Sequence, residues 1–198
     1  MQGISQADIV APGLADPVFD SQRVFRAVLD AMARPGRLAR VDVALAPPAP
    51  LDPATAAVVL ALADFDAPVW LNADAGAEAI AGYVRFHSGA PIVVESARAA
   101  FAICLAAPSL ARFNLGTDEF PEASTTVVVQ VADLAAGGPL TLTGPGIERA
   151  HHLGVTGLPD DFWAERRAVT ADFPRGIDLI LTCGRHLCAV PRTTTVEV

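Results

Sequence analysis

The chain has 198 residues, 52% of them hydrophobic and 18% charged, which is typical of a globular domain rather than of a disordered chain. All 14 basic residues are arginine, so the chain lacks the lysine of a Walker A loop and the lysine of a pyridoxal phosphate aldimine. The net charge of -8 argues against broad contact with nucleic acid or an anionic membrane. We expect a single domain over residues 1–198, with no nucleic-acid partner and no membrane partner.

The cysteines and the N-terminal segment indicate the compartment. Three cysteines without the spacing of a disulfide framework fit a reducing environment. The segment MQGISQADIVAPGLADP lacks the basic and apolar regions of a signal peptide, and no apolar run reaches the roughly 18 residues of a membrane span. We therefore expect a cytoplasmic protein whose residues 1–16 form a flexible arm or strap.

Regular structure is expected to begin at a helix with the sequence DSQRVFRAVLDAMARPG. Asp20 is a suitable N-cap, and Pro35-Gly36 ends the helix. The next segments predict a strand in RLARVDVAL and a helix in ATAAVVLALADF, which Asp52-Pro53 caps at its first turn. The apolar face of the first helix consists of Val24, Phe25, Val28, Leu29 and Met32, at spacings of three and four residues.

Short helices and strands alternate through the rest of the chain. The predicted strands are PVWL, PIVV, AFAI, TTVVVQVA, PLTLT and a hairpin of IDLIL with HLCAV; the predicted helical segments are AGAEAIAGYVRFH, PSLARFN and DDFWAERRAV. The wholly apolar runs TTVVV and IDLILTC indicate central strands that are buried on both faces. This pattern predicts an α/β domain with a central mixed sheet and helices on both faces.

Two groups of histidine and cysteine are candidates for metal binding or catalysis. If Gly184-Arg185 makes a two-residue turn, Cys183 faces His186 and Cys188 lies on the same face. A structural zinc needs four ligands and no fourth is evident nearby, so we expect no metal site. His151 and His152 are adjacent and point in different directions in regular structure, which disfavours shared metal ligation. Either one of them serves as an acid or base, or both are surface or capping residues. Signatures of the common hydrolases, metalloproteases and dinucleotide-binding enzymes are absent from the sequence.

Two glycines and two Pro-Arg pairs are candidates for anion binding. Gly144 and Gly146, in LTLTGPGIERA, form either a nest of outward-pointing N–H groups or an ordinary tight turn. Arg175 and Arg192 each follow a proline at the ends of the apolar hairpin. A guanidinium fits carboxylate or phosphate, so the pair forms an anion clamp or two solvated turns. Glu122 in NLGTDEFPEASTT is a strand-mouth carboxylate or an ordinary loop residue.

The motifs taken together resemble the H subunit family of the bacterial carbon-phosphorus lyase system for phosphonate degradation. The resemblance rests on FRAVLDAMARPG, GTDEFPEAST, LTLTGPGI, FPRGIDLIL and AVPRTT, in this order, and runs from about Pro17 to Thr195. It implies a three-layer α/β/α sandwich similar to pyridoxal phosphate-dependent transferases but without the lysine. It also implies a cytoplasmic homodimer that joins the G, I and J subunits.

The resemblance further implies a function in phosphonate catabolism. In that system the G, H, I and L proteins transfer the ribose triphosphate moiety of ATP to a phosphonate and release adenine. We expect an accessory subunit that has no cofactor of its own, within a complex that uses ATP. The alternatives are a purely structural scaffold subunit and a stand-alone phosphoryl-compound hydrolase or transferase.

No catalytic residue is carried over from the family, and the expected site roles are physical inferences. Arg34, Arg175 and Arg192 are expected to contact an anion or a partner. Gly144 and Gly146 are expected to form the nest, and Asp178 to orient a nearby arginine.

Overall fold

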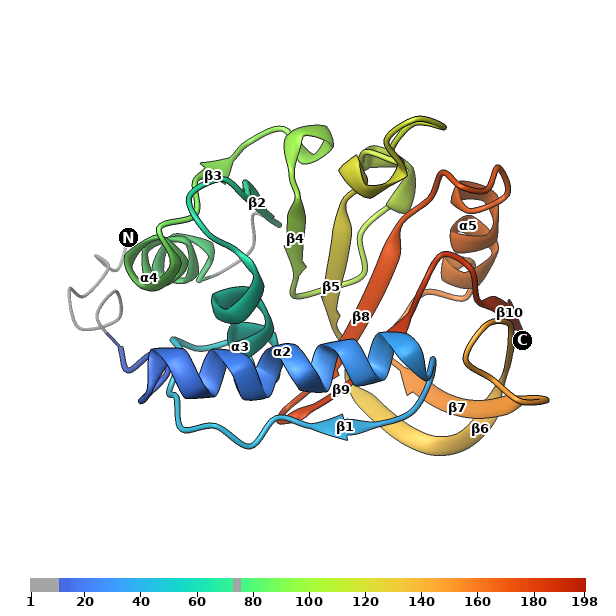
Figure 1. The fold of residues 1–198 in the computed structure, drawn as a ribbon, viewed down its shortest axis with the longest axis horizontal. Coiled ribbons are helices and arrows are strands. Elements are labelled where there is room, and N and C mark those ends of the chain that lie inside the picture. Colours follow the sequence, from blue (N-terminus) through green and yellow to red (C-terminus); the bar gives the residue numbers. More distant parts are fainter. Residues whose placement is uncertain (1–10, 73–75) are drawn as a thin grey trace.

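A mixed sheet of seven strands runs through the middle of the molecule (Figure 1). The structure is a computed structural model that describes residues 11–72 and 76–198. The strands of this sheet are β1 (Ala39–Arg40), β2 (Val69–Leu71), β3 (Ile92–Val93), β4 (Phe101–Cys104), β5 (Thr126–Gln130), β8 (Asp178–Cys183) and β9 (His186–Val190). Their order is β1-β9-β8-β5-β4-β2-β3, parallel from β3 to β8 and antiparallel at β9 and β1. The predicted α/β class with a mixed central sheet is confirmed.

Strands β5 and β8 lie side by side in the middle of this sheet, as their apolar runs predict. Successive strand residues point to opposite faces. Val128 and Ile180 therefore pack in one hydrophobic core, and Val127 and Leu179 pack in the other. All four side chains are buried, which explains why these strands carry no polar alternation.

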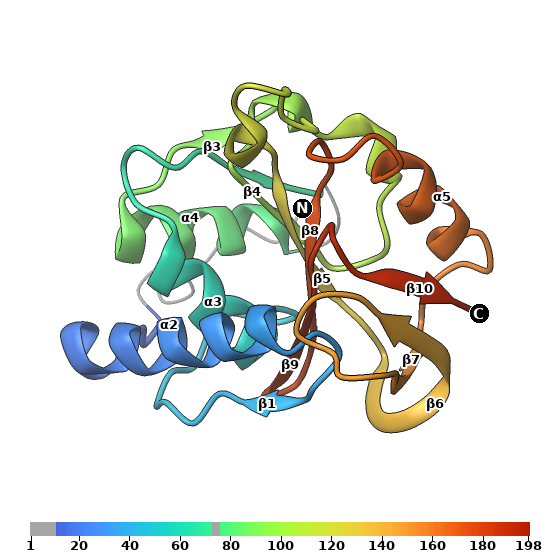
Figure 2. The same cartoon turned by 45° about the vertical axis from the view of Figure 1, so that its right-hand side comes forward.

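Three helices cover one face of the sheet: α2 (Pro17–Ala33), α3 (Pro53–Leu62) and α4 (Ala77–Ser88) (Figure 2). Helix α3 is apolar on nearly all sides because it lies between the sheet and its two neighbouring helices. Its hydroxyl at Thr55 bonds to that of Thr182 on β8, 2.7 Å away, which pairs two buried polar groups.

The other face of the sheet is covered by helix α5 (Phe162–Val169) and by a second sheet (Figure 2). This antiparallel sheet has the order β10-β6-β7 and consists of β6 (Asp133–Thr143), β7 (His151–Thr156) and β10 (Thr195–Glu197). Short 3₁₀ turns are η1 (Ser96–Arg98), η2 (Leu110–Arg112) and η3 (Pro121–Ala123). This face therefore differs from the layer of helices that the sequence predicts.

Helix α2 begins four residues earlier than predicted. Its N-cap is Asp16, whose carboxylate accepts hydrogen bonds from the N–H groups of Val18 and Phe19. Asp20 lies in the first turn instead, where its carboxylate accepts the N–H of Asp16 at 3.0 Å. Pro17 at the first helical position made the true start readable from the sequence, because its φ is already helical.

The apolar face predicted for α2 divides into a buried and an exposed part. Val24 and Val28 are buried against the core, whereas Phe25 and Leu29 are 50% and 57% exposed. Val18 is exposed as well and lies seven residues before Phe25, on the same side of the helix. These three residues form an exposed apolar stripe along the helix.

Residues 1–10, most of the predicted arm, lie outside the described residues, but residues 11–16 are described. The carbonyl of Pro12 accepts hydrogen bonds from Ala46 N–H at 2.9 Å and from the Tyr83 hydroxyl at 3.1 Å. His87 on the same helix, α4, bonds to the carbonyl of Ala11. These hydrogen bonds therefore attach the segment at Ala11 and Pro12 to α4 and to the connection at Ala46, which lies between β1 and α3 in the chain.

Asp52 precedes α3 as expected, but its side chain does not cap the helix. The carboxylate accepts the N–H of Gly184 at 2.7 Å, in the turn between β8 and β9. The Gly184 carbonyl in turn accepts the N–H of Ala54 at 2.9 Å. Asp52 therefore links the start of α3 to the hairpin turn, while Pro53 starts the helix.

Two strands of the small sheet were not predicted from the sequence. Strand β7 reads HHLGVT, where the glycine and the histidine pair hide the β pattern. Strand β10 has only three residues and follows PRTT directly. Both depend on pairing with β6, which is a tertiary contact that local sequence does not show.

Candidate functional site

Three of the sequence motifs meet at the C-terminal end of α2. Gly146 packs so closely on this helix end that a Cβ there would overlap the carbonyl oxygen of Ala33. A Cβ on Gly144 would lie 2.8 Å from the carbonyl oxygen of Thr193, in the PRTT segment. Gly36, after the helix, donates its N–H to the carbonyl of Ala189 on β9 at 2.9 Å. The fold thus brings RPG, GPG and PRTT together from distant parts of the chain.

The two glycines of GPG have positive φ angles, 133° at Gly144 and 83° at Gly146, which favour glycine. The turn closes with a hydrogen bond from Ile147 N–H to the Gly144 carbonyl at 3.1 Å, and Pro145 has no N–H to offer. The structure therefore explains both glycines by close packing of the loop. The nest function stays a prediction.

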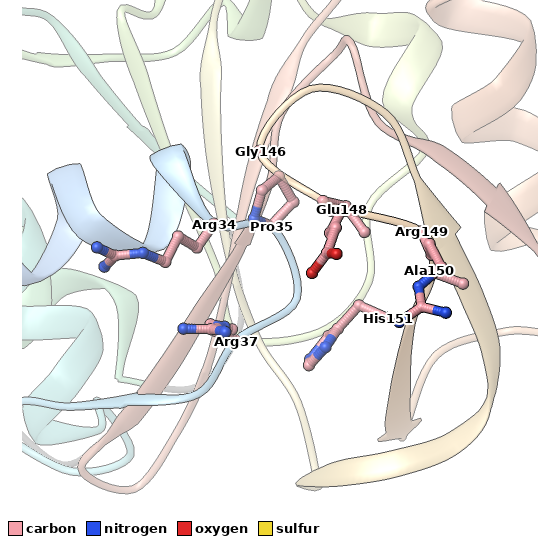
Figure 3. Close-up of a pocket in the computed structure, with 9 residues that line it drawn as sticks. Arg34, Pro35, Arg37, Gly146, Glu148, Arg149, Ala150 and His151 are labelled. Carbon is pink, nitrogen blue, oxygen red and sulfur yellow. The ribbon is translucent and has the colours of Figure 1, made fainter.

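A cleft of about 250 Å³ opens beside this junction (Figure 3). It is lined by Arg34, Pro35, Arg37, Gly146, Ile147, Glu148, Arg149, Ala150 and His151. Three arginines and one glutamate give it a positive charge in a protein whose net charge is -8. This local charge is suited to an acidic group rather than to a basic one.

The arginines of the cleft do not converge on one point. Figure 3 shows the guanidinium groups of Arg34 and Arg37 pointing to one side and that of Arg149 to the other, with the carboxylate of Glu148 between them. Arg34 is the C-cap residue of α2 and forms an ion pair with Asp30 one turn earlier. This arrangement suits an extended acidic surface better than a single small anion.

The two histidines of this region lie on β7 and point to opposite faces, as adjacent strand residues do. His151 lies in the cleft, where its Nε2 is 3.2 Å from the carbonyl oxygen of Gly36. His152 pairs with Thr141 on β6, with its Nδ1 3.4 Å from the threonine hydroxyl. Each imidazole thus has a partner within the protein, which favours the interpretation of both histidines as surface or capping residues.

Arg192 is held by five contacts, as many as a guanidinium has N–H donors. It donates Nε and Nη2 to the carboxylate of Asp178, at 3.3 and 2.6 Å. The remaining donors reach the carbonyls of Pro121 and Pro174 and the hydroxyl of Ser124. Asp178 thus orients Arg192 and also accepts its backbone N–H at 2.8 Å. A fully occupied guanidinium has no donor left for an anion, so Arg192 acts as a structural clasp.

Arg175 contrasts with Arg192. Its side chain is 43% exposed and lies between two exposed carboxylates, with Nη2 2.8 Å from Asp172 and Nε 3.4 Å from Asp118. The two arginines of the Pro-Arg pairs therefore do not form one clamp. Their link is indirect, through the bond from Arg192 to the Pro174 carbonyl.

The hairpin places Cys183 opposite His186, as predicted. Burial and the carboxylates of Asp52 and Asp133 raise the pKa of Cys183, and burial raises the pKa of Cys188 to about 12. Neither thiol is therefore a ready thiolate nucleophile at neutral pH. Within residues 11–72 and 76–198, no group of three side chains able to hold a metal ion comes together.

Sequence reasoning did not single out Arg37, Arg149 or Arg166. The first two lie next to motifs that were recognised, but only the fold puts them in one cleft. Arg166 is on α5 and is almost completely buried, because it falls on the same helix face as Phe162 and Val169. The spacing of three and four residues between these side chains is the sequence pattern from which the burial of Arg166 could have been predicted.

Comparison with known proteins decides the family. A family profile described as "Bacterial phosphonate metabolism protein (PhnH)" matches residues 12–197. The chain belongs to this family. A relative from Rhizobium meliloti (strain 1021), named "Alpha-D-ribose 1-methylphosphonate 5-triphosphate synthase subunit PhnH", is 43% identical over 199 residues, covering 98% of each chain. A second relative, "Putative C-P lyase subunit protein HtxG" from Stutzerimonas stutzeri, is 41% identical over 85 residues, 43% of this chain and 44% of that protein.

The family assignment agrees with the resemblance drawn from the motifs. The matched residues include all the segments that carry it, from the first helix to PRTT. None of the described helices is long and apolar enough to cross a membrane.

Proposed function

We propose that this protein is a subunit of a complex that transfers the ribose triphosphate moiety of ATP to a phosphonate and releases adenine. The observation that carries the proposal is the 43% identity to a ribose 1-methylphosphonate 5-triphosphate synthase subunit over 98% of both chains. Identity at this level over whole chains supports a shared biochemical role. The protein acts in the cytoplasm with the G, I and L proteins of the same system.

Within the complex, the protein contributes assembly and positioning rather than the reacting groups. In support, the histidines of the cleft region are bonded to a backbone carbonyl and a threonine, and the described cysteines have raised pKa values. Its ATP requirement belongs to the complex, and the chain carries no cofactor of its own. The likeness of its fold to pyridoxal phosphate-dependent transferases remains a prediction.

The exposed apolar stripe of α2 supports a function in assembly. Val18, Phe25 and Leu29 leave apolar side chains in water, whereas a partner surface would bury them. The stripe therefore belongs to an interface, either with a second copy of the chain or with the G, I or J subunit. The arginine cleft beside the end of the same helix provides a charged contact for an acidic group of the ligand or of a partner.

The proposal is tested by reconstitution with one component omitted. Purified G, I and L partner proteins are mixed with ATP and methylphosphonate, and released adenine is measured by chromatography with and without this chain. We expect adenine release only when the chain is present. Equal release without it contradicts the proposed function, and turnover of ATP by the isolated chain favours a stand-alone enzyme instead.

The cleft is tested in the same assay by adding back Arg37→Ala and Arg149→Ala in place of the wild-type chain. Both side chains are exposed, so we expect the variants to fold. Phe65→Ala, at an exposed site that does not line the cleft, is the matched control. We expect weaker assembly or turnover for the two cleft variants only. Unchanged assembly and turnover in both variants removes the cleft from the functional site.

A further inference from the structure

A second pocket lies on the other side of the PRTT segment, between it and helix α5. Its volume is about 420 Å³, and it is lined by Trp163, Arg166, Arg167, Thr170, Ala171, Phe173, Arg192, Thr193, Thr194, Thr195 and Val196. This pocket shares no lining residue with the arginine cleft. It therefore requires an explanation of its own.

The unusual group in this pocket is the guanidinium of Arg166. Its side chain is 3% exposed, and it donates Nη1 to the carbonyl of Thr194 and Nη2 to the carbonyl of Pro191. Its Nε has no hydrogen-bond partner in the part of the chain that the structure describes. Within residues 11–72 and 76–198, two of its five N–H donors are thus occupied, whereas Arg192 in the PRTT segment has all five occupied.

Among the described residues, no carboxylate lies at ion-pair distance from Arg166. Asp178, whose charge acts on it, is bonded to Arg192 instead. A buried charge without a close partner is costly. Burial accordingly lowers the pKa of Arg166 to about 10, and the charge of Asp178 only partly offsets this. The hydroxyl of Thr194, whose carbonyl bonds to the same guanidinium, is a second buried polar group without a hydrogen-bond partner among the residues that the structure describes. Buried polar groups are normally paired, so this pocket lacks negative charge and hydrogen-bond acceptors.

The rest of the pocket has both polar and apolar walls. Arg167 is exposed and donates Nη2 to the carbonyl of Val196 at 3.3 Å, which holds a second positive charge beside the pocket. Thr193 and Thr195 present exposed hydroxyl-bearing residues on the same segment. Phe173 is 70% exposed at the rim, where its ring has apolar surface to offer to a ligand.

We propose that this pocket binds a small phosphoryl-type oxyanion that carries a compact apolar group. The oxygens lie against Arg166, Arg167 and the threonine hydroxyls, and the apolar group lies against Phe173 and Trp163. A tetrahedral oxyanion suits the pocket better than a carboxylate because it offers three acceptor oxygens to several donors. The inference rests on contacts within this chain and does not depend on the proposed function of the complex.

The test measures binding of defined probes to the purified full-length chain by titration calorimetry. The probes are phenyl phosphate, phenylphosphonate, benzoate and inorganic phosphate. We expect the two phenyl-bearing phosphoryl probes to bind more tightly than benzoate or inorganic phosphate, and their comparison distinguishes an ester from a phosphonate. Arg166→Met should weaken phenyl phosphate binding about tenfold or more, because it removes a charged donor. Phe173→Ala should weaken phenyl phosphate about fivefold and leave inorganic phosphate unchanged.

Phe65→Ala, at an exposed site that lines neither this pocket nor the arginine cleft, is the matched control and should bind phenyl phosphate like the wild type. If circular dichroism shows that Arg166→Met does not fold, the exposed Phe173→Ala variant decides the question. The proposal is overturned if the wild type binds neither phenyl probe, or if Phe173→Ala binds phenyl phosphate as tightly as the wild type. It is also overturned if binding is lost in Arg37→Ala, which would place the anion in the arginine cleft.

Discussion

The clasp around Arg192 predicts a large loss of stability on its removal. In Arg192→Ala, the segments around Pro121, Ser124 and Pro174 lose their donor. The carboxylate of Asp178 loses the guanidinium and keeps the backbone N–H of residue 192. Breaking a buried ion pair by removing one partner costs about 3–5 kcal/mol. The two side chains retain 14% and 17% exposure, so we expect a loss of about 2–4 kcal/mol.

Arg175→Ala is the matched control, because it removes the same side chain after a proline at the other end of the same hairpin. Arg175 is 43% exposed, and both of its carboxylate partners, Asp118 and Asp172, are exposed as well. An exposed pair of this kind contributes less than about 1 kcal/mol. Urea denaturation followed by circular dichroism gives the free energy of unfolding of both variants and of the wild type.

The double variant Arg192→Ala/Asp178→Ala adds a check on the cause. Removing the stranded carboxylate as well should make the double variant more stable than the sum of the two single losses predicts, because neighbouring residues do not act additively. A loss below about 1 kcal/mol in Arg192→Ala, or equal losses in Arg192→Ala and Arg175→Ala, would show that Arg192 is not a structural clasp.

The remaining predictions concern the packing of a glycine, the surface of α2 and one thiol. Gly146→Ala should destabilise the fold by at least about 1 kcal/mol more than Gly137→Ala. Both glycines have φ near +80°, but of the two only Gly146 would bring its added Cβ against a backbone carbonyl. Equal losses of stability in thermal melts would contradict this prediction. Phe25→Glu should change the free energy of unfolding by no more than about 0.5 kcal/mol but weaken assembly, whereas Phe65→Glu should change neither. Thermal melts measure the stability, and co-purification with the partner subunits measures the assembly. Unimpaired assembly of Phe25→Glu would show that the stripe is not part of the interface. Cys183 should react with iodoacetamide more slowly than free cysteine at pH 8, because its raised pKa leaves less thiolate, and the rate should rise with pH; a rate equal to that of free cysteine contradicts this.

Much of the fold was predictable because local patterns and tertiary packing agree. The β-branched runs of β5 and β8 are buried on both faces, and the hairpin register puts Cys183 opposite His186. The small sheet was missed because β7 and β10 are strands only by pairing with β6. The helix start at Asp16 was missed because Asp20 offered the same capping chemistry four residues later.

The candidate site was predictable only in part. Arg34 and Gly146, both candidates from sequence motifs, line one cleft. The cleft also contains Arg37 and Arg149, which no motif had indicated. The sequence does not show that Arg192 is fully bonded and Arg175 is exposed. This difference depends on the carbonyls of Pro121 and Pro174, which the fold places beside Arg192. Arg166 shows the same limit, since its two acceptors lie in a segment 25 and 28 residues away.

Functional replacement of the related subunit tests the proposed function most directly. The complex of Rhizobium meliloti is assembled without its own PhnH subunit, which is 43% identical to this chain, and this chain is supplied in its place. Incubation with ATP and methylphosphonate is followed by phosphorus NMR and mass spectrometry of the product. We predict formation of ribose 1-methylphosphonate 5-triphosphate with one adenine released per product. If the chain enters the complex and no product forms, or if product forms equally well without it, the proposed function is wrong.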